Sequence, residues 1–192
     1  MDIINNNYKI LDKCRISNSN KIIEILSLGP QPLANSLKKR QFQEEQKYPL
    51  SISFCEESSL LQLNETIKKE ILFDSYVWVT STSSTAKNYA KTFYKNLNKV
   101  IKLDKNDDLI IEIASNDGTF LKPFLENGHK KVIGVDPAKN ICDLANKNNI
   151  KTINNYWGKE CSKNFLKQYG KAKLLIARNV IPHVSELNDV ML

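Results

Sequence analysis

The sequence contains few of the residues that mark several special classes of protein. Its four cysteines, at positions 14, 55, 142 and 161, are too few and too scattered for a disulfide scaffold, so we expect reduced thiols. No apolar run approaches the length of a membrane span, and the N-terminal stretch lacks the apolar core of a signal peptide. These absences predict a cytoplasmic protein without a membrane partner.

Acidic residues are in the minority. Lysine and arginine number 28 against 21 aspartates and glutamates, which gives a formal net charge of +7 at pH 7. Lysine is spread through the whole chain, and the densest basic stretches are not interleaved with aromatic residues on which bases could stack. The pattern favours a solvated surface over a nucleic-acid interface, and the positive field suits an anionic small substrate.

One stretch, residues 108–139, organises the rest of the chain. The short apolar run 109–113 is typical of a strand buried on both faces, and residues 114–118 are small and turn-forming. Residues 119–127 have the apolar spacing of a helix, and a second buried strand then ends at Asp136. This pattern predicts one β-α-β unit, in which a loop leads into a helix and a carboxylate closes the neighbouring strand.

A nucleoside-containing cofactor fits this unit. The N–H groups of a loop before a helix suit an anionic group, and Asp136 suits the two hydroxyls of a ribose. Only Gly118 has a counterpart among the three glycines of the dinucleotide motif, which argues against an NAD-type oxidoreductase. Glu112, at the base of the turn, is more typical of enzymes that use S-adenosylmethionine (SAM). An ordinary α/β crossover without a ligand is the alternative.

The chain beyond this unit continues the alternation of helices and strands. We expect helices over 137–148 and 158–169 and strands over 150–153 and 172–177, which gives the first half of a doubly wound α/β sheet. In such a sheet the fourth strand lies beside the first and would be an exposed apolar edge. The simplest explanation is a missing C-terminal half, which could also be a separate polypeptide.

Residues 1–70 form a small, mostly β module in this interpretation. Strands are expected over 21–28, 48–55 and 60–63, with a turn over 29–32. Cys14 and Cys55 each begin a four-residue knuckle of a possible zinc site, but the second ligand position of both knuckles is serine. A serine hydroxyl stays protonated near neutral pH, so two thiols are favoured over a metal site.

Residues 71–104 connect this module to the nucleoside-binding domain, residues 105–192. If the aromatic-rich stretch 71–84 is a strand, Tyr76 and Trp78 lie on one face of it, either in a substrate pocket or packed against the next domain. Residues 85–100 have helical spacing and are expected to form a connector helix capped by Ser83 or Ser84.

In chain order, these motifs resemble those of the SAM-dependent sugar C-methyltransferases of deoxysugar and polysaccharide biosynthesis. The resemblance runs through the whole chain and corresponds to the N-terminal half of those enzymes. Their LG-x-x-PLANS segment is similar to residues 28–36, their YPL to 48–50, their aromatic Y-x-Y-x-SS stretch to 73–83, and their three cofactor segments to 112–121, 134–138 and 178–184.

The resemblance implies a zinc-ribbon-like module, a helical connector and a truncated, Rossmann-like class I SAM-binding domain. The implied substrate is a nucleotide-linked keto sugar, which loses a proton next to its ketone and attacks the methyl group of SAM as an enolate. The family's principal base, a histidine next to a glutamate, has no counterpart in this chain. The alternative is a non-catalytic remnant or binding subunit that at most retains cofactor contacts.

The same resemblance implies roles for individual residues. The turn at 114–118 would hold the methionine part of SAM, Asp136 the ribose and Tyr156 the adenine, with Asn179 and His183 near the methyl group. Tyr76 and His183 are the implied catalytic residues, although Trp78 replaces a second aromatic residue and has no phenol. The predicted cofactor-binding residues are Glu112, Ala114, Ser115, Asn116, Asp117, Gly118, Asp136, Pro137, Asn155, Tyr156 and Asn179.

Overall fold

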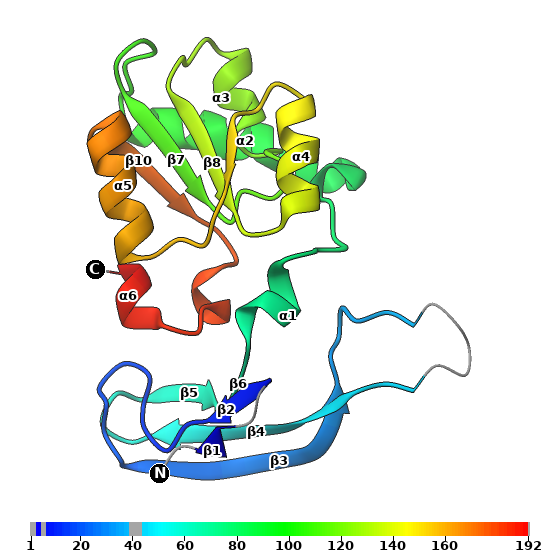
Figure 1. Ribbon diagram of the computed structural model, residues 1–192. Helices are drawn as coiled ribbons and strands as arrows, with labels where there is room; N and C mark the ends of the chain where they lie inside the picture. The colour runs from blue at the N-terminus through cyan, green and yellow to red at the C-terminus, as the bar shows by residue number, and fades with distance from the viewer. Residues whose placement is uncertain (1–2, 5–6, 39–43, 192) are drawn as a thin grey trace. The chain divides into compact units, whose positions relative to one another are not determined.

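A computed structural model describes residues 3–4, 7–38 and 44–191 of the chain, which divides into two units (Figure 1). Unit 1 comprises Met1–Leu72 and Ser185–Asn188, and unit 2 comprises Phe73–Val184 and Asp189–Leu192. Within the described ranges, no helix is both long enough and apolar enough to cross a membrane.

A parallel sheet of four strands lies at the centre of unit 2 and confirms the predicted α/β class. The strands follow the order β10-β7-β8-β9, so the fourth lies beside the first as expected. All residues of β7 and β8 are buried, which explains why these strands are continuous apolar runs in the sequence. The bounds are β7 Leu109–Ile113, β8 Val132–Asp136, β9 Thr152–Asn154 and β10 Ala172–Ala177.

Helices cover both faces of this sheet (Figure 1). Ile110 packs in one core cluster with Tyr94 and Phe124, whereas Ile111 packs on the opposite face with Phe165. The predicted connector helix is therefore also part of the core of unit 2, because Tyr94 belongs to it. The helices are α2 Ser84–Val100, capped by Ser83 as predicted, α3 Lys122–Glu126 and α4 Lys139–Lys147 on the first face, and α5 Lys159–Tyr169 on the second.

The helix expected over 119–127 is shorter than predicted. The backbone at Gly118 has a φ of +76°, which lies outside the right-handed helical region. The chain therefore turns first, and the N–H groups of Leu121 and Lys122 both donate to the Gly118 carbonyl. The five-residue helix α3 begins only at Lys122, so the turn at 114–118 does not lead directly into a helix N-terminus.

The aromatic stretch 71–84 is not a strand. Helix α1 (Lys69–Phe73) is followed by an irregular segment and by the 3-10 helix η1 (Thr80–Thr82). The expectation that Tyr76 and Trp78 share the face of a strand is therefore wrong. The backbone of this segment bonds to side chains of unit 2 instead of to a neighbouring strand, as described below.

Unit 1 contains two small antiparallel sheets. The strands β4 and β5 confirm the predicted hairpin, and β4 alternates between buried and less buried residues. The turn predicted over 29–32 instead lies within β3, where the pairing register shifts and Gly29 has a φ of +63°. One sheet consists of β3 Ile22–Pro32, β4 Lys47–Cys55 and β5 Leu60–Leu63, and the other of β1 Ile3–Ile4, β2 Tyr8–Ile10 and β6 Glu65–Ile67. The last elements of the chain are the 3-10 helix η2 Ile181–His183 and α6 Leu187–Met191.

The core of the chain is unevenly divided between the units. Among the described residues of unit 1, the buried apolar side chains are Cys14, Tyr48 and Cys55. The inward face of β4 carries Ser51 and Ser53, which are both buried. Unit 2 contains the other buried apolar residues of the described chain, most of them in the two clusters on either side of its sheet.

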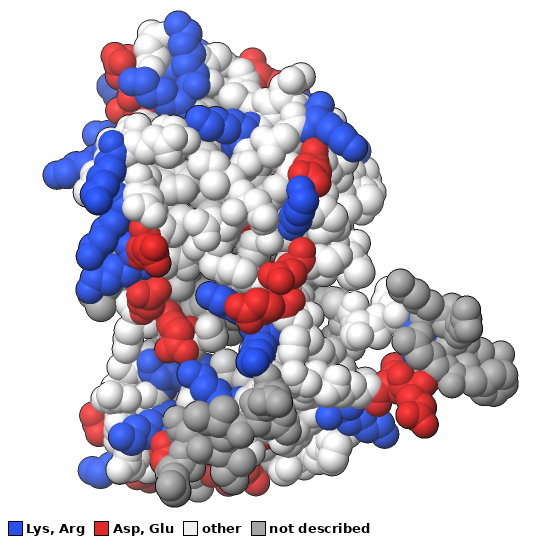
Figure 2. All heavy atoms as spheres, in the orientation of Figure 1, with Lys and Arg blue, Asp and Glu red and all other residues white. Residues whose placement is uncertain are grey.

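Charged side chains are spread over the surface. On the face shown in Figure 2, Lys and Arg lie among Asp, Glu and uncharged residues. Some of them form exposed pairs one helical turn apart, such as Lys139 with Asp143 at 3.2 Å, and such pairs contribute little to stability.

Candidate functional site

The turn after β7 contains strained backbone. Ala114 and Asn116 both have a φ of +51°, and Asn179, which follows β10, has a φ of +52°. Left-handed conformations of residues other than glycine cost roughly 1–3 kcal/mol each and are concentrated at functional sites. Three predicted cofactor-binding residues therefore have strained backbone after two adjacent strands.

The carboxylate of Asp136 points toward this turn. Its Oδ2 accepts a hydrogen bond from the Asn116 N–H at 2.9 Å, and its Oδ1 accepts one from the Ala138 N–H at 2.9 Å. Burial raises the pKa of Asp136, and the two N–H donors oppose that effect. Since a carboxylate oxygen can accept more than one hydrogen bond, each oxygen has capacity left for a further donor.

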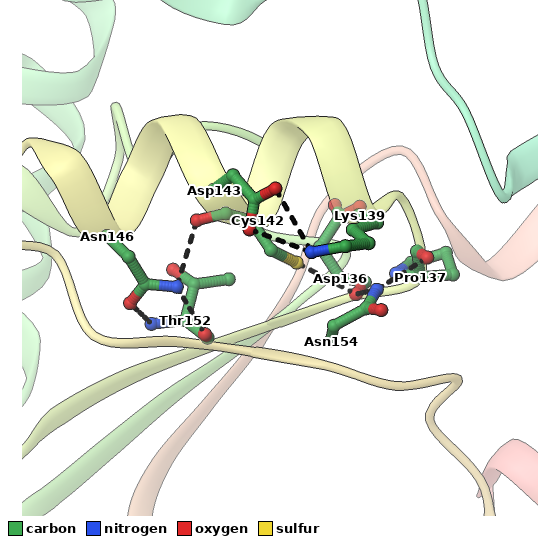
Figure 3. Close-up of polar contacts among 8 residues, drawn as sticks. All are labelled: Asp136, Pro137, Lys139, Cys142, Asp143, Asn146, Thr152 and Asn154. Carbon is green, nitrogen blue, oxygen red and sulfur yellow. Dashed lines mark hydrogen bonds and ion pairs between the residues drawn. The ribbon is translucent and has the colours of Figure 1, made fainter.

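The end of β8 is held in place from two sides (Figure 3). The Asp136 carbonyl accepts hydrogen bonds from the Cys142 thiol and the Asn154 amide, each at 3.1 Å, and from the Asn155 N–H at 3.1 Å. The Asn154 amide also donates to the Pro137 carbonyl at 2.6 Å. The position of the Asp136 carboxylate is thus fixed by its neighbours before any ligand binds.

An open pocket of about 430 Å³ adjoins Asp136. In this pocket the Tyr156 hydroxyl donates to Asp74 Oδ1 at 2.8 Å. The predicted site residues Pro137, Asn155 and Tyr156 all line the pocket, so the structure brings these three together. The complete lining is Asp74, Pro137, Lys139, Asn154, Asn155 and Tyr156.

Residues 74–81, which we call the strap, bond to the start of α4 at one end. The Lys139 N–H donates to the Asp74 carbonyl at 3.2 Å. The Asn140 side chain makes two bonds to the backbone of Tyr76, accepting from its N–H at 3.1 Å and donating to its carbonyl at 2.8 Å. A side-chain amide thereby takes the place of a neighbouring strand.

The other end of the strap bonds to the turn after β7. Asn116 Oδ1 accepts from the N–H and the hydroxyl of Thr80 at 2.8 and 3.0 Å, and Asn116 Nδ2 donates to the Trp78 carbonyl at 3.0 Å. Asp117 Oδ2 accepts from the Ser81 N–H at 3.0 Å. The predicted cofactor residues Asn116 and Asp117 thus direct their side chains to the strap.

Sequence reasoning missed the residues that hold the strap, Asp74, Thr80, Ser81 and Asn140. No periodicity or motif pairs residue 76 with residue 140 or residue 80 with residue 116, because these contacts depend on the tertiary fold. A single signal pointed to this region, the aromatic stretch that includes Tyr76.

Gly118 is buried behind the turn. A Cβ atom added to it would lie 2.5 Å from Ile150 Cγ2, so its α-carbon faces this side chain. Its N–H donates to the Ser115 carbonyl at 3.1 Å. This position favours a role in forming the turn over direct contact with a cofactor.

Glu112 and Ser115 bring unpaired polar atoms into the interior. Glu112 is 1% exposed, and its Oε1 accepts from Arg178 Nε at 3.2 Å. In the part of the chain that the structure describes, Glu112 Oε2 and Ser115 Oγ have no hydrogen-bond partner. Burial raises the pKa of Glu112, the Arg178 guanidinium opposes this effect, and the resulting pKa is about 8.

This raised pKa predicts a pH-dependent stability. Between the ordinary pKa of 4.5 and about 8, the folded state binds more protons than the unfolded state, so the free energy of unfolding falls as pH rises through this window. We expect a loss on the order of 2 kcal/mol or more from pH 5 to pH 8 that Glu112→Gln removes, measured by urea unfolding.

The pH dependence of the free energy of unfolding must be compared between the wild type and Glu112→Gln, because other groups titrate in the same pH range. Burial lowers the pKa of His129, which adds a slope of opposite sign, and burial raises the pKa of Asp136. Both contributions are common to the wild type and the variant. Equal slopes in the two proteins would show that Glu112 does not titrate in this window.

Tyr76 and His183, the implied catalytic residues, lie on different elements. Tyr76 is half-buried in the strap, and its ring centroid is 6.4 Å from that of Phe73. His183 is the last residue of η2, and its side chain is exposed. Their catalytic roles stay predictions.

The two knuckles of unit 1 come together. Cys14 Sγ lies 3.1 Å from Ser58 Oγ, and Cys55 Sγ lies 3.8 Å from Ser17 Oγ. Both thiols are buried. Within the described ranges, no group of three or more His, Cys, Asp or Glu side chains could hold a metal ion.

Comparison with known proteins supports a methyltransferase class. Residues 14–73 match a family model described as "Putative zinc binding domain". The chain is also 27% identical over 183 residues to the C-methyltransferase NovU of Streptomyces niveus, an alignment that covers 94% of this chain and 43% of NovU. The predicted resemblance to C-methyltransferases is confirmed, and the chain spans less than half the length of this relative.

Proposed function

We propose that this chain provides the SAM-binding part of a C-methyltransferase. The observation that carries the proposal is the Asp136 carboxylate, held at the strained turn after β7 and followed in the chain by Pro137, which lines an open pocket. The parallel strand order β10-β7-β8-β9 supports the proposal, because open parallel α/β sheets bind ligands at the carboxyl ends of their strands, where the strand order reverses. The similarity to NovU supports methyl transfer as the reaction.

The residues present fit the adenosine part of SAM. The remaining lone pairs of Asp136 suit two ribose hydroxyls, and the pocket with Tyr156 and Asn155 suits the adenine. The methionine end would lie toward Ala114 and Asn179, where the backbone is strained. Bound SAM supplies an electrophilic methyl group, and the protein must hold a carbon nucleophile in line with it.

The proposed substrate is a nucleotide-linked keto sugar, activated by proton removal next to its ketone. Tyr76 would act at the sugar as an acid/base or positioning group, with His183 near the methyl group, and the net positive charge favours an anionic nucleotide. The outer edge of β10 pairs with no strand of the described chain, and Leu175 on β10 is half-exposed. We therefore also propose that further strands of the enzyme pair with the outer edge of β10, and that the same part of the enzyme carries the catalytic base.

The cofactor proposal is tested by calorimetry with SAM and its demethylated product. We expect Asp136→Ala to weaken binding by about 1–3 kcal/mol, or roughly 5- to 150-fold, because charged hydrogen bonds to the ribose are lost. Asp143→Asn is the matched control, since Asp143 lies exposed on α4 and pairs with Lys139. Equal affinities for wild type and Asp136→Ala would show that the ribose binds elsewhere.

The second candidate is a non-catalytic binding subunit. It is favoured by the protein contacts that Asn116, Asp117 and Asp136 already make. If no binding is seen at millimolar SAM, this second candidate replaces the first.

A further inference from the structure

Four side chains of unit 1 lie at the corners of a small cluster, two from each knuckle. Cys14 and Ser17 come from the loop after β2, and Cys55 and Ser58 come from the end of β4 and the turn that follows it. The two cross-knuckle distances are 3.1 Å for Cys14 Sγ to Ser58 Oγ and 3.8 Å for Ser17 Oγ to Cys55 Sγ. A third contact, from the Ser17 N–H to Cys14 Sγ at 3.5 Å, lies within the first knuckle.

The two cross-knuckle distances are near those between the ligand atoms of a zinc site. With bonds of about 2.0–2.3 Å, the ligand atoms of a tetrahedral zinc site lie roughly 3.3–3.8 Å apart. The cross-knuckle distances are close to this range, and the matched family model, which begins at Cys14, is that of a zinc-binding domain. The two knuckles therefore bring each cysteine next to the serine of the other knuckle, at about the separation of two zinc ligands.

The chemistry of the four groups does not fit zinc. Structural zinc sites use thiolate, imidazole or carboxylate ligands, whereas a serine hydroxyl is neutral and holds its proton. Each hydroxyl here lies within hydrogen-bonding distance of the thiol of the other knuckle. We propose that unit 1 brings the two knuckles of a zinc site together but closes them with hydrogen bonds between sulfur atoms and hydroxyls, and that it folds without a metal ion.

Other side chains provide the cross-links that zinc would otherwise supply. The Arg15 guanidinium donates to the carbonyls of Leu63 and Glu65 at 3.0 and 3.4 Å and to the Thr66 hydroxyl at 2.6 Å. The side chain of Gln62 accepts from the Arg15 N–H at 2.9 Å and donates to the Lys13 carbonyl at 3.0 Å. The first knuckle is thus tied to β5 and β6 independently of the four clustered side chains.

A buried polar network adds to these cross-links. Glu65 accepts from both the N–H and the hydroxyl of Ser51, at 2.8 and 2.9 Å, and the Asn64 amide donates to the same hydroxyl at 2.8 Å. This network joins β4 to β6 within unit 1. It needs no metal, because every bond in it joins protein groups.

The proposal is tested by measuring metal content and melting temperature of the full chain. After expression with added zinc, we expect the purified wild type to contain far less than one zinc per chain and to melt at the same temperature with and without a chelator. Ser17→Cys/Ser58→Cys should contain about one zinc per chain and lose several degrees of melting temperature in chelator, since its four thiolates complete a structural site.

The control adds two thiols elsewhere in unit 1. Ser27→Cys/Ser36→Cys places them at exposed positions outside the cluster and should bind no stoichiometric zinc. One equivalent of zinc in the wild type, or a chelator-sensitive melting temperature, would overturn the proposal. A folded Ser17→Cys/Ser58→Cys protein without zinc would overturn the inference that the two knuckles lie as in a zinc site. If that variant does not fold, the zinc content and melting temperature of the wild type decide whether unit 1 needs a metal ion.

Discussion

Gly118→Ala is expected to destabilise unit 2 by about 2–5 kcal/mol. A left-handed backbone conformation costs an alanine roughly 1–2 kcal/mol, and overpacking a buried site adds about 1–3 kcal/mol. Both apply here, because Gly118 has a φ of +76° and its new Cβ would lie 2.5 Å from Ile150 Cγ2. Urea unfolding of the full chain measures the loss.

Two further variants separate the backbone cost from the steric cost. Gly128→Ala is the control for the backbone, since Gly128 has a φ of +90° and its nearest contact is the flexible Lys105 side chain at 3.9 Å. Ile150→Ala removes the clashing atoms, so the double variant Gly118→Ala/Ile150→Ala should lose less stability than the sum of the two single variants. Equal losses for Gly118→Ala and Gly128→Ala would contradict the packing described at the turn.

Asn116→Gly is expected to release the strap with a net destabilisation of only about 1–2 kcal/mol. It removes three hydrogen bonds worth about 1 kcal/mol each, and glycine relieves roughly 1–2 kcal/mol of left-handed backbone strain. Glycine preserves the left-handed backbone at this position and the N–H that bonds to Asp136. The variant therefore isolates the side chain that holds Thr80 and Trp78. Hydrogen exchange at the Thr80 N–H should become much faster.

The matched control is Asn127→Gly. Asn127 caps the end of α3, and its side chain donates to the Pro123 carbonyl within the same helix. Its exchange effects should stay near α3 and leave the Thr80 N–H unchanged. If Asn116→Gly leaves exchange in residues 78–81 unchanged, Asn116 does not hold the strap.

The strands of unit 2 could be predicted because each is a short apolar run bounded by turn-forming or charged residues. Leu109–Ile113 is buried along its whole length, so its pattern carries little ambiguity. The position of Asp136 at the turn also follows from sequence, since a parallel sheet brings the carboxyl ends of neighbouring strands to one edge.

The strap could not be predicted in the same way. Its aromatic residues suggested a strand, but an isolated backbone segment can satisfy its polar groups with side chains as well as with another strand. Here Asn140 and Asn116 do so, and their sequence positions give no sign of it. The start of α3 could not be predicted, because it depends on the left-handed backbone conformation of Gly118.

The two knuckles of unit 1 could be predicted in part. Their spacing identified the four positions of a possible zinc site, and the chemistry of serine predicted that two of them are poor ligands for zinc. What the sequence could not reveal is that Arg15 and Gln62 cross-link the same region, because these bonds join residues far apart in the chain.

The polar interior of unit 1 affects how its stability changes with temperature. Unfolding raises the heat capacity in proportion to the apolar surface that becomes exposed, and exposed polar surface lowers it. With Ser51 and Ser53 on the inward face of β4 and few buried apolar side chains among its described residues, unit 1 is expected to have a small heat-capacity change of unfolding for its length. Its free energy of unfolding is consequently a flatter function of temperature than that of unit 2.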